Sequence, residues 1–287
     1  MYRVYSPRRH SRVAVAVLAL CLTVATVCHL PVAPTAATPT EGVAVPIIMY
    51  HSILDNPSRQ GDYVITPEQF EEDLQCLQAN GYTTVGINDL IAYVNEGVPL
   101  PDKAVVLTFD DGYYNNYHYA HPLLTEYGMK AVLSPIGIWS EYYSAHPSEC
   151  NRDNYSHLTW EQLREMAQSG AWEIQNHSYD LHHIDGGQKG AAKRKDENED
   201  AYRRRLKADL ATAQDLLREQ VGVTPSAFAY PYGAISEASQ GVLEEMGFVA
   251  SLSCEEKTAV ITRDPACLWR LGRYLRPANK NIASILK

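Results

Sequence analysis

The sequence predicts an α/β fold in which a parallel β-sheet is covered by helices. Two observations support this prediction. Strand-like and helix-like segments alternate from residue 45 to the end of the chain, and the segment Ala104–Phe109 is almost continuously apolar. Strands separated by helical stretches are typical of parallel sheets, and an apolar run is typical of a strand buried on both faces. With 287 residues and no internal repeat, the chain is long enough for one large domain or two small ones.

Short apolar segments, each followed by polar or turn-forming residues, are the candidates for the strands of this sheet. In chain order they are Val45–Tyr50, Ala104–Phe109, Lys130–Ser134, Trp172–Gln175, Ser226–Tyr230 and Phe248–Leu252.

Two helices are predicted from capping boxes. Thr66 and Gln69 form the first box, Pro67 fits the first helical turn, and Gly81 ends the segment. Thr159 and Gln162 repeat the pattern ahead of a second helix that stops at Gly170.

A third helix is predicted from periodicity. Leu206, Leu210, Ala213 and Leu217 are spaced as on one face of a helix. The charged stretch from Lys189 to Lys207 precedes and overlaps it and mixes both signs, so we interpret it as a solvated loop that runs into a surface helix.

The N-terminal residues have the order of an export signal. Four arginines and no acid lie within residues 1–12, followed by an apolar run from Val13 to about Cys28 and small residues up to Ala37. The apolar run is close to the minimum length for spanning a membrane, so an uncleaved anchor is the alternative. We expect an exported protein, extracellular or in the cell envelope, with residues 1–37 as signal or anchor, 38–44 as a tether and 45–287 as the domain.

Charge and cysteine content limit the partners. Removal of residues 1–37 changes the formal net charge from −9 to −13, and such an acidic domain lacks the basic footprint of a nucleic-acid binder. The four remaining cysteines, at positions 76, 150, 254 and 267, match no zinc-binding spacing. A Cys254–Cys267 disulfide and four thiols are both compatible with the sequence.

The most informative segment is Thr108–Tyr113, with the sequence T-F-D-D-G-Y. An apolar strand ends there in two adjacent acids, Asp110 and Asp111. Side chains alternate along an extended strand, so one carboxylate can bind a metal while the other stays free as a base. Taken alone, the segment is equally well explained as an Asp-Gly turn, and the rest of the chain must decide.

Other strand candidates also end in polar residues. Trp172–Gln175 is followed by His177 and His182, and Val45–Tyr50 is followed by His51. The carboxyl ends of parallel strands converge, so these residues are expected to lie near Asp110 and Asp111. His177, His182 and Asp111 form a ligand set for a divalent metal that leaves positions open for water and substrate. Asp110 is then the candidate base, and hydrolysis of an amide or ester carbonyl is the predicted reaction class.

These segments resemble the motifs of the polysaccharide deacetylase family, also called the NodB homology domain or carbohydrate esterase family 4. Residues 108–112 match its first motif, T-F-D-D-G, in full. Its second motif, H-[ST]-x-x-H, is matched at His177, but the second histidine comes one residue late, at His182, as in the branch acting on poly-β-1,6-N-acetylglucosamine. Its third motif, R-x-P-[YF]-G, appears as A-Y-P-Y-G at residues 229–233. The resemblance runs from about Pro46 to Arg276 and implies a single distorted (β/α)7 barrel.

The resemblance also implies roles. It makes Asp110 the catalytic base and Asp111 a metal ligand, and it places the backbone N–H of Tyr232 in the oxyanion hole. Tyr230 and Pro231 are assigned to substrate binding. The metal is expected to be zinc, although such sites also accept cobalt, nickel or iron. The implied partner is an N-acetylated polysaccharide, and we expect a monomer.

The sequence also departs from the family pattern elsewhere. The family's late Asp-containing motif is not recognisable in Gly247–Lys257. Ala229 replaces the arginine that pairs with the base, and the segment Leu268–Tyr274 lacks the family's final histidine, which carries the general acid. Our hypothesis is that His51 protonates the leaving amine or orients substrate; a core or capping histidine is an equally good interpretation.

The remaining candidates for the lining of the cleft are open to structural interpretations of equal weight. They are His183, Asp185, His118 and Tyr230. Trp160, Trp172 and Trp269 are candidates for stacking on sugar rings, although burial is the commoner outcome for tryptophan. We interpret the chain as an exported metal-dependent hydrolase that removes N-acetyl groups from amino sugars of an envelope or extracellular polymer. The alternatives are the same site acting on another acyl substrate, such as an O-acetyl ester or peptidoglycan, and a catalytically degenerate barrel that only binds glycan.

Overall fold

The structure, a computed structural model, describes residues 42–286. The predicted signal or anchor at residues 1–37 lies outside the described residues, as does most of the tether. Among the described helices, none combines the length and apolar character that a membrane crossing requires.

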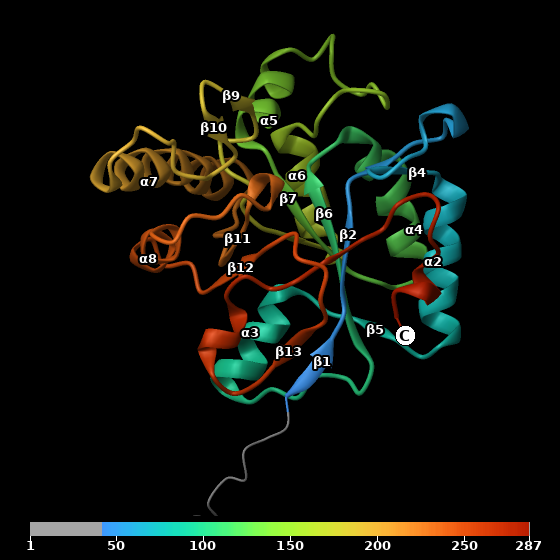
Figure 1. Ribbon diagram of the computed structural model, residues 1–287. Helices are drawn as coiled ribbons and strands as arrows, with labels where there is room; N and C mark the ends of the chain where they lie inside the picture. The colour runs from blue at the N-terminus through green and yellow to red at the C-terminus, as the bar shows by residue number, and fades with distance from the viewer. Residues whose placement is uncertain (1–41, 287) are drawn as a thin grey trace, which may run out of the picture. The chain divides into compact units, whose positions relative to one another are not determined.

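A parallel sheet forms the centre of the molecule (Figure 1). Its strands follow the order β14-β2-β6-β7-β8, with β5 also paired to β6. Every pairing in this sheet is parallel. The six strands are β2 (Ile47–Tyr50), β5 (Thr83–Thr84), β6 (Ala104–Asp111), β7 (Ala131–Pro135), β8 (Trp172–Ile174) and β14 (Tyr274–Leu275).

Isolated bridges extend this sheet into a distorted barrel. Asn176, just after β8, forms a parallel bridge to Phe228 in β11 (Ala227–Ala229). β11 pairs in parallel with β12 (Ala250–Leu252), and Leu252 bridges to Leu271, three residues ahead of β14. The strands thus return to the first edge of the sheet. The predicted (β/α)7-type barrel is confirmed, with the distortion lying where bridges replace full strand pairing.

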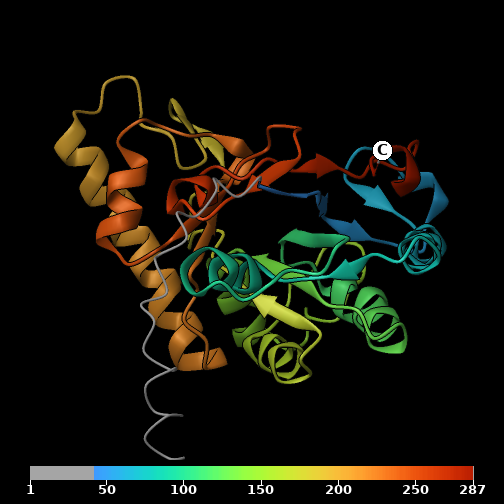
Figure 2. The ribbon, with the colours of Figure 1, turned by 90° about the horizontal axis from the view of Figure 1, so that it is seen from below.

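Helices surround the strands (Figure 2). α7 and α8 lie on one side, while α2 lies on the opposite side. The helices are α2 (Pro67–Ala79), α3 (Ile87–Glu96), α4 (His121–Glu126), α5 (Gly137–Ala145), α6 (Trp160–Gln168), α7 (Glu199–Leu216) and α8 (Ser239–Glu245). The remaining short strands are β1 (Val43–Val45), β3 (Ser52–Ile53), β4 (Val64–Ile65), β9 (Ile184–Asp185), β10 (Gln188–Lys189) and β13 (Ala259–Ile261).

Alternation along β6 separates two apolar clusters. Leu107 and Phe109 belong to the cluster that includes residues of α2, α4 and α6, whereas Ala104 and Val106 belong to a second cluster with residues of α3, β11 and β12. All eight residues of β6 are buried. Asp110 continues the parity of Val106, so its side chain follows the second set, away from the helices of the first cluster.

The predicted elements are largely confirmed. Both capping boxes form, at Thr66–Gln69 and Thr159–Gln162. The periodic segment after the charged stretch is α7, capped by Asn198. The strand predicted at Val45–Tyr50 is divided, because the chain leaves β1, which pairs with β13, and enters β2, which pairs with β6.

Candidate active site

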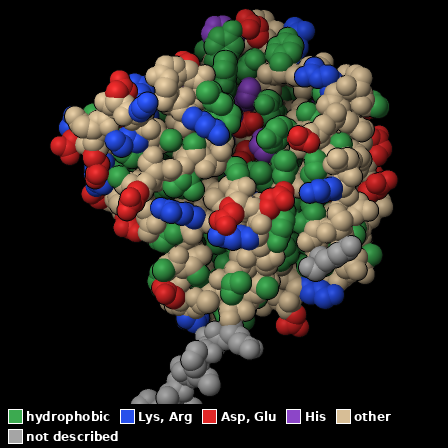
Figure 3. All heavy atoms as spheres, viewed as in Figure 1, with side chains coloured by type: hydrophobic (Ala, Val, Ile, Leu, Met, Phe, Trp, Pro, Cys, Tyr) green, Lys and Arg blue, Asp and Glu red, His purple; other side chains and the backbone are tan. Residues whose placement is uncertain are grey.

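The carboxyl ends of the barrel strands surround one cavity of about 530 Å³. Its lining includes residues from strands far apart in the sequence, namely His51, Asp110, Asp111, His177, His182, Tyr232 and Cys254. Figure 3 shows a cleft with histidine and acidic side chains on its floor and hydrophobic side chains along its borders. The predicted convergence of polar residues at this end of the sheet is therefore present in the structure.

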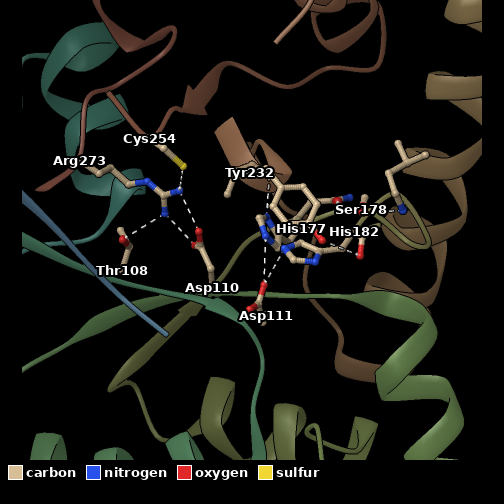
Figure 4. Close-up of polar contacts among 12 residues, drawn as sticks. Thr108, Asp110, Asp111, His177, Ser178, His182, Tyr232, Cys254 and Arg273 are labelled. Carbon is tan, nitrogen blue, oxygen red and sulfur yellow. Dashed lines mark hydrogen bonds and ion pairs between the residues drawn. The ribbon is translucent and has the colours of Figure 1, made fainter. Parts of the chain in front are cut away.

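Asp111, His177 and His182 gather into one cluster (Figure 4). Asp111 Oδ1 lies 3.4 Å from His177 Nε2 and 3.2 Å from His182 Nε2. One ligand atom from each residue lies within 4.8 Å of the others, as in a set that can hold a metal ion. Asp111 Oδ1 is buried and has no hydrogen-bond donor among the described residues. A buried carboxylate oxygen without a donor fits the role of a metal ligand.

The histidine orientation fits the same role. His177 Nδ1 lies 2.8 Å from the carbonyl oxygen of Ala229, so Nδ1 donates its proton there and Nε2 presents a lone pair toward Asp111. Burial raises the pKa of Asp111, but the neighbouring histidines lower it by more than burial raises it. The pKa of Asp111 therefore lies well below its usual range. A carboxylate and two imidazoles of this kind suit zinc and related divalent ions.

Backbone conformation at the end of β6 separates the two acids. Asp111 has φ 72°, in the left-handed region that L-residues seldom occupy, so its side chain departs from the alternation of the strand. Gly112 follows with φ 75°, and a Cβ there would lie 2.9 Å from Pro135 Cβ. Glycine is therefore required by both conformation and space.

The loop that carries both histidines is fixed by short-range hydrogen bonds. Ser178, at φ 77°, donates its N–H to Asn176 Oδ1 at 2.7 Å. Asp209 of α7 accepts the N–H groups of Tyr179 and Asp180, each at 2.8 Å. The loop between His177 and His182 is thereby anchored to α7.

Asp110 is held by Arg273 in a buried, bidentate ion pair. The two oxygens of Asp110 accept from Arg273 at 2.7 and 2.8 Å, and Arg273 has no exposed surface. Arg273 also donates to the carbonyl of Ser253 and to the hydroxyl of Thr108. Burial raises the pKa of Asp110, but the guanidinium and nearby histidines outweigh burial and lower it below its ordinary value. Asp110 is therefore ionised at neutral pH.

Sequence reasoning missed Arg273. Ala229 occupies the family's arginine position and cannot pair with Asp110, and Arg273, just ahead of β14, makes that contact instead. The available signal was an arginine within the apolar sequence Leu271–Leu275, close to the position where the missing histidine was sought. Position in the motif could not reveal it, because the partner comes from another strand.

His51 lies in the cavity lining, as predicted. Its Nδ1 atom is buried without a hydrogen-bond partner among residues 42–286. The edge of its ring packs against Tyr63, with the ring centroids 4.8 Å apart. Burial lowers the pKa of His51 below its ordinary value, so the imidazole is neutral at pH 7.

The turn after β11 places Tyr232 and Tyr230 differently. Tyr232, at φ 58°, lines the cavity, and its ring lies 4.3 Å from that of His182. Tyr230 is 1% exposed, and its hydroxyl pairs with Ser239 at 2.8 Å. The assignment of Tyr230 to substrate binding is therefore corrected to a core role. Pro231 is also buried and outside the cavity lining, and its carbonyl packs closely against Gly190.

The other candidates for the lining lie elsewhere. His183 and Asp185 approach each other at 3.4 Å on the exposed hairpin, and His118 contacts the hydroxyl of Tyr114. Trp160 and Trp172 are buried. Among the described residues, the four cysteines are free thiols, and Cys254 borders the cavity.

Comparison with known proteins agrees with this geometry. The sequence model described as "Polysaccharide deacetylase" matches residues 97–251. The chain belongs to the polysaccharide deacetylase family. The resemblance inferred from the motifs is therefore confirmed.

Named relatives of this family share a substrate name. The chain is 29% identical over 217 residues to the poly-β-1,6-N-acetyl-D-glucosamine N-deacetylase of Escherichia coli, covering 70% of this chain and 32% of the relative. It thus spans about a third of that relative's length. It is 25% identical over 230 residues to the Staphylococcus epidermidis protein of the same name, covering 80% of this chain and 74% of the relative.

A solved family structure also matches. A de-N-acetylase from Aggregatibacter actinomycetemcomitans superposes with a TM-score of 0.72 at 27% identity. The superposition covers 84% of this chain and 98% of that structure. The barrel described above is therefore the fold of the polysaccharide deacetylase family.

Proposed function

We propose that this protein is an exported, metal-dependent N-deacetylase that removes acetyl groups from N-acetylglucosamine units of an envelope or extracellular polysaccharide. The observation that carries the proposal is one cavity holding an Asp-His-His cluster, in which Asp111 and His177 are buried and His182 is half-buried, beside a separate buried aspartate, Asp110. A site that only bound glycan would need neither. The names of the relatives favour a β-1,6-linked polymer, and the order of charged and apolar residues at the N-terminus favours export.

The chain's own groups divide the chemistry among them. Asp111, His177 and His182 would hold the divalent metal, which polarises a carbonyl and lowers the pKa of water when bound. Asp110 takes a proton from the attacking water as the C–O bond forms, and Arg273 keeps Asp110 ionised and oriented. The backbone N–H of Tyr232 is assigned to the oxyanion, and zinc is the expected metal.

His51 is assigned to the leaving group. Because its imidazole is neutral at pH 7, it must first receive the proton that Asp110 accepts from water. It then delivers that proton to the nitrogen as the C–N bond breaks. The second proton of the water stays on the new carboxyl group, so an amine and acetic acid leave the site, and the acid ionises to acetate in solvent. This order of proton transfers protonates the leaving nitrogen without an external acid.

The degenerate-barrel alternative is weakened by the ion pair. It drew support from the missing arginine at position 229, and Arg273 supplies the contact instead.

The test is acetate release by residues 38–287 from β-1,4- and β-1,6-linked N-acetylglucosamine oligomers, with zinc, with chelator, and in Asp110→Asn. Release that requires both the metal and Asp110, with a preference for the β-1,6 linkage, is the expected result. Metal binding without release from any oligomer would contradict the proposal and favour another acyl substrate or glycan binding.

The role of His51 is tested by comparing two substrates whose leaving groups differ in their need for a proton. His51→Ala should slow N-acetyl hydrolysis about 10²-fold or more, because an amine leaves only when protonated. An aryl acetate, whose leaving group needs no proton, should be hydrolysed at close to the wild-type rate. Equal losses on both substrates would assign His51 to substrate orientation or folding instead.

A further inference from the structure

α5 carries an aromatic side chain that neither the fold nor the proposed chemistry uses. Trp139 is 42% exposed, whereas Trp160 and Trp172 are buried and Trp269 is half-buried. Large exposed aromatic side chains often mark ligand-binding surfaces in soluble proteins. Figure 3 shows hydrophobic side chains gathered at the upper end of the cleft, in the region where Figure 1 places α5.

Trp139 is connected to the cavity through a series of ring contacts. Its ring stacks on His157, with the centroids 5.5 Å apart and the planes inclined by 16°. His157 in turn contacts Tyr113, which follows Gly112 and lines the cavity. The ring centroids of His157 and Tyr113 lie 4.8 Å apart. The rings of Tyr113, the buried His157 and Trp139 therefore contact one another in series from the cavity to the exterior, and they are here called the aromatic platform.

The aromatic platform is fixed relative to the metal-binding loop. The N–H groups of Gly137 and Ile138, at the start of α5, each donate at 3.0 Å to the carbonyls of Ser178 and Tyr179. A Cβ at Gly137 would lie 3.0 Å from the ring of Tyr179. α5 thus packs directly on the loop between His177 and His182. A ligand on Trp139 would find a surface already ordered with respect to the site, which lowers the entropic cost of binding.

We infer that the aromatic platform is a sugar-binding subsite, in which the exposed face of Trp139 stacks on a pyranose ring next to the unit being deacetylated. The inference rests on the proposed function, because a polymer held at the Asp-His-His cluster must continue out of the cavity. The series of ring contacts begins at the cavity wall with Tyr113 and ends at the exposed Trp139. A pyranose ring presents an apolar C–H face, and an indole fixed on one side by His157 offers a matching apolar face on the other.

Kinetics on oligomers of increasing length test the subsite. In the wild-type protein, kcat/KM should rise from N-acetylglucosamine to the β-1,6-linked trimer and pentamer. In Trp139→Ala, most of that rise should disappear, with KM for the pentamer about tenfold higher. Trp139→Phe, which keeps an aromatic face, should retain most of it. An equal effect on all lengths, or none, would overturn the subsite.

Binding without turnover separates this inference from the proposed function. Pentamer is added to Asp110→Asn while tryptophan emission and calorimetric heat are followed. Emission should change in this variant and in its Trp269→Phe derivative. It should not change with Trp139→Phe, which still binds by calorimetry, and Trp139→Ala should lose both signals. Such Trp139-dependent binding without acetate release from wild-type protein would reject the deacetylase proposal and retain the subsite. Release without Trp139-dependent binding would reject the subsite alone.

Discussion

Two buried aspartate–arginine pairs flank the last barrel strand, β14, and only one of them lies in the cavity. Arg273 pairs with Asp110, and Arg276 pairs with Asp73 of α2 at 2.7 Å. Each of these four side chains is at most 3% exposed. Tyr50 also donates its hydroxyl to Asp73, whereas Asp110 accepts both of its side-chain hydrogen bonds from Arg273.

The two carboxyls nevertheless differ in acidity. Burial raises the pKa of both, but Arg273 and the histidines of the cavity bring the pKa of Asp110 below its ordinary value. At Asp73, burial outweighs Arg276 and Tyr50, and the pKa ends above its ordinary value. A buried ion pair alone is therefore no sign of catalysis. What distinguishes Asp110 is its access to the cavity and the cationic and metal-binding groups around it.

The largest expected difference between the pairs is in turnover. Asp110→Asn should lower kcat for N-acetyl hydrolysis by about 10²- to 10⁴-fold, because the amide cannot accept a proton from water. Asp73→Asn should leave the turnover of folded molecules unchanged and lower the free energy of unfolding by about 3–5 kcal/mol, because Arg276 keeps a buried, uncompensated charge. Active-site titration with metal and urea unfolding measure the two effects. Loss of turnover in folded Asp73→Asn would break the comparison.

Replacing the arginine of each pair should affect the pH dependence of activity differently. With Arg273→Met, burial is no longer offset by the guanidinium, so the pKa of Asp110 should rise. The acid limb of the kcat/KM profile should then move toward neutral pH, with about 10- to 100-fold less activity at pH 7 that recovers as the pH is raised.

Arg276→Met is the matched control for that variant. It should be destabilised by about 3–5 kcal/mol while its acid limb stays in place, because Asp73 takes no part in turnover. An acid limb at the wild-type position in Arg273→Met would mean that Arg273 does not set the ionisation of Asp110.

Metal binding should stabilise the folded protein through the Asp-His-His cluster beside Asp110, and the Asp73–Arg276 pair should not contribute. Zinc at 100 times its dissociation constant should raise the free energy of unfolding by about 2.7 kcal/mol, because the ion binds the folded chain. Asp73→Asn should keep this gain, measured as a shift in Tm, whereas Asp111→Asn should lose most of it. An undiminished gain in Asp111→Asn would place the zinc at another site.

The smallest expected effects come from the hydroxyl groups beside each pair. Tyr50→Phe removes a donor from Asp73, and Thr108→Val removes an acceptor from Arg273. Each should lower stability by about 1 kcal/mol. Only Thr108→Val should also shift the pH profile of activity, because only its neighbour Asp110 takes part in turnover. A shift in Tyr50→Phe would show that the two pairs are coupled.

The sequence predicted the parts of this site that are local in the chain. β6, its two terminal acids and the histidines after β8 lie where strand pattern and motif spacing indicated. Both capping boxes did so as well, since a box involves only four consecutive residues. The helices α3, α4, α5 and α8 were not predicted from the sequence, because short helices are stabilised mainly by packing on the barrel.

The parts that could not be predicted depend on contacts between distant segments. Arg273 meets Asp110 only because the barrel brings its last strand, β14, beside β2, the neighbour of β6, and no sequence spacing records that closure. Tyr230 continues the alternation of Phe228 and is buried with it against residues of α7 and α8, so its burial depends on where those two helices pack. The aromatic platform likewise depends on α5 packing against the loop after β8.

Conformational strain in the backbone is concentrated where the chemistry is proposed. Five non-glycine residues within residues 42–286 have positive φ, and three of them are at the Asp-His-His cluster. Asp111 belongs to the cluster, Ser178 follows His177 directly, and the ring of Tyr232 contacts that of His182. Each such residue costs about 1–2 kcal/mol relative to a relaxed backbone. Laboratory evolution for heat resistance alone would thus favour glycine at these three positions, and at Asp111 and Tyr232 it would remove a side chain that lines the cavity. Selection for thermal stability and selection for turnover should pull this segment of the barrel in opposite directions.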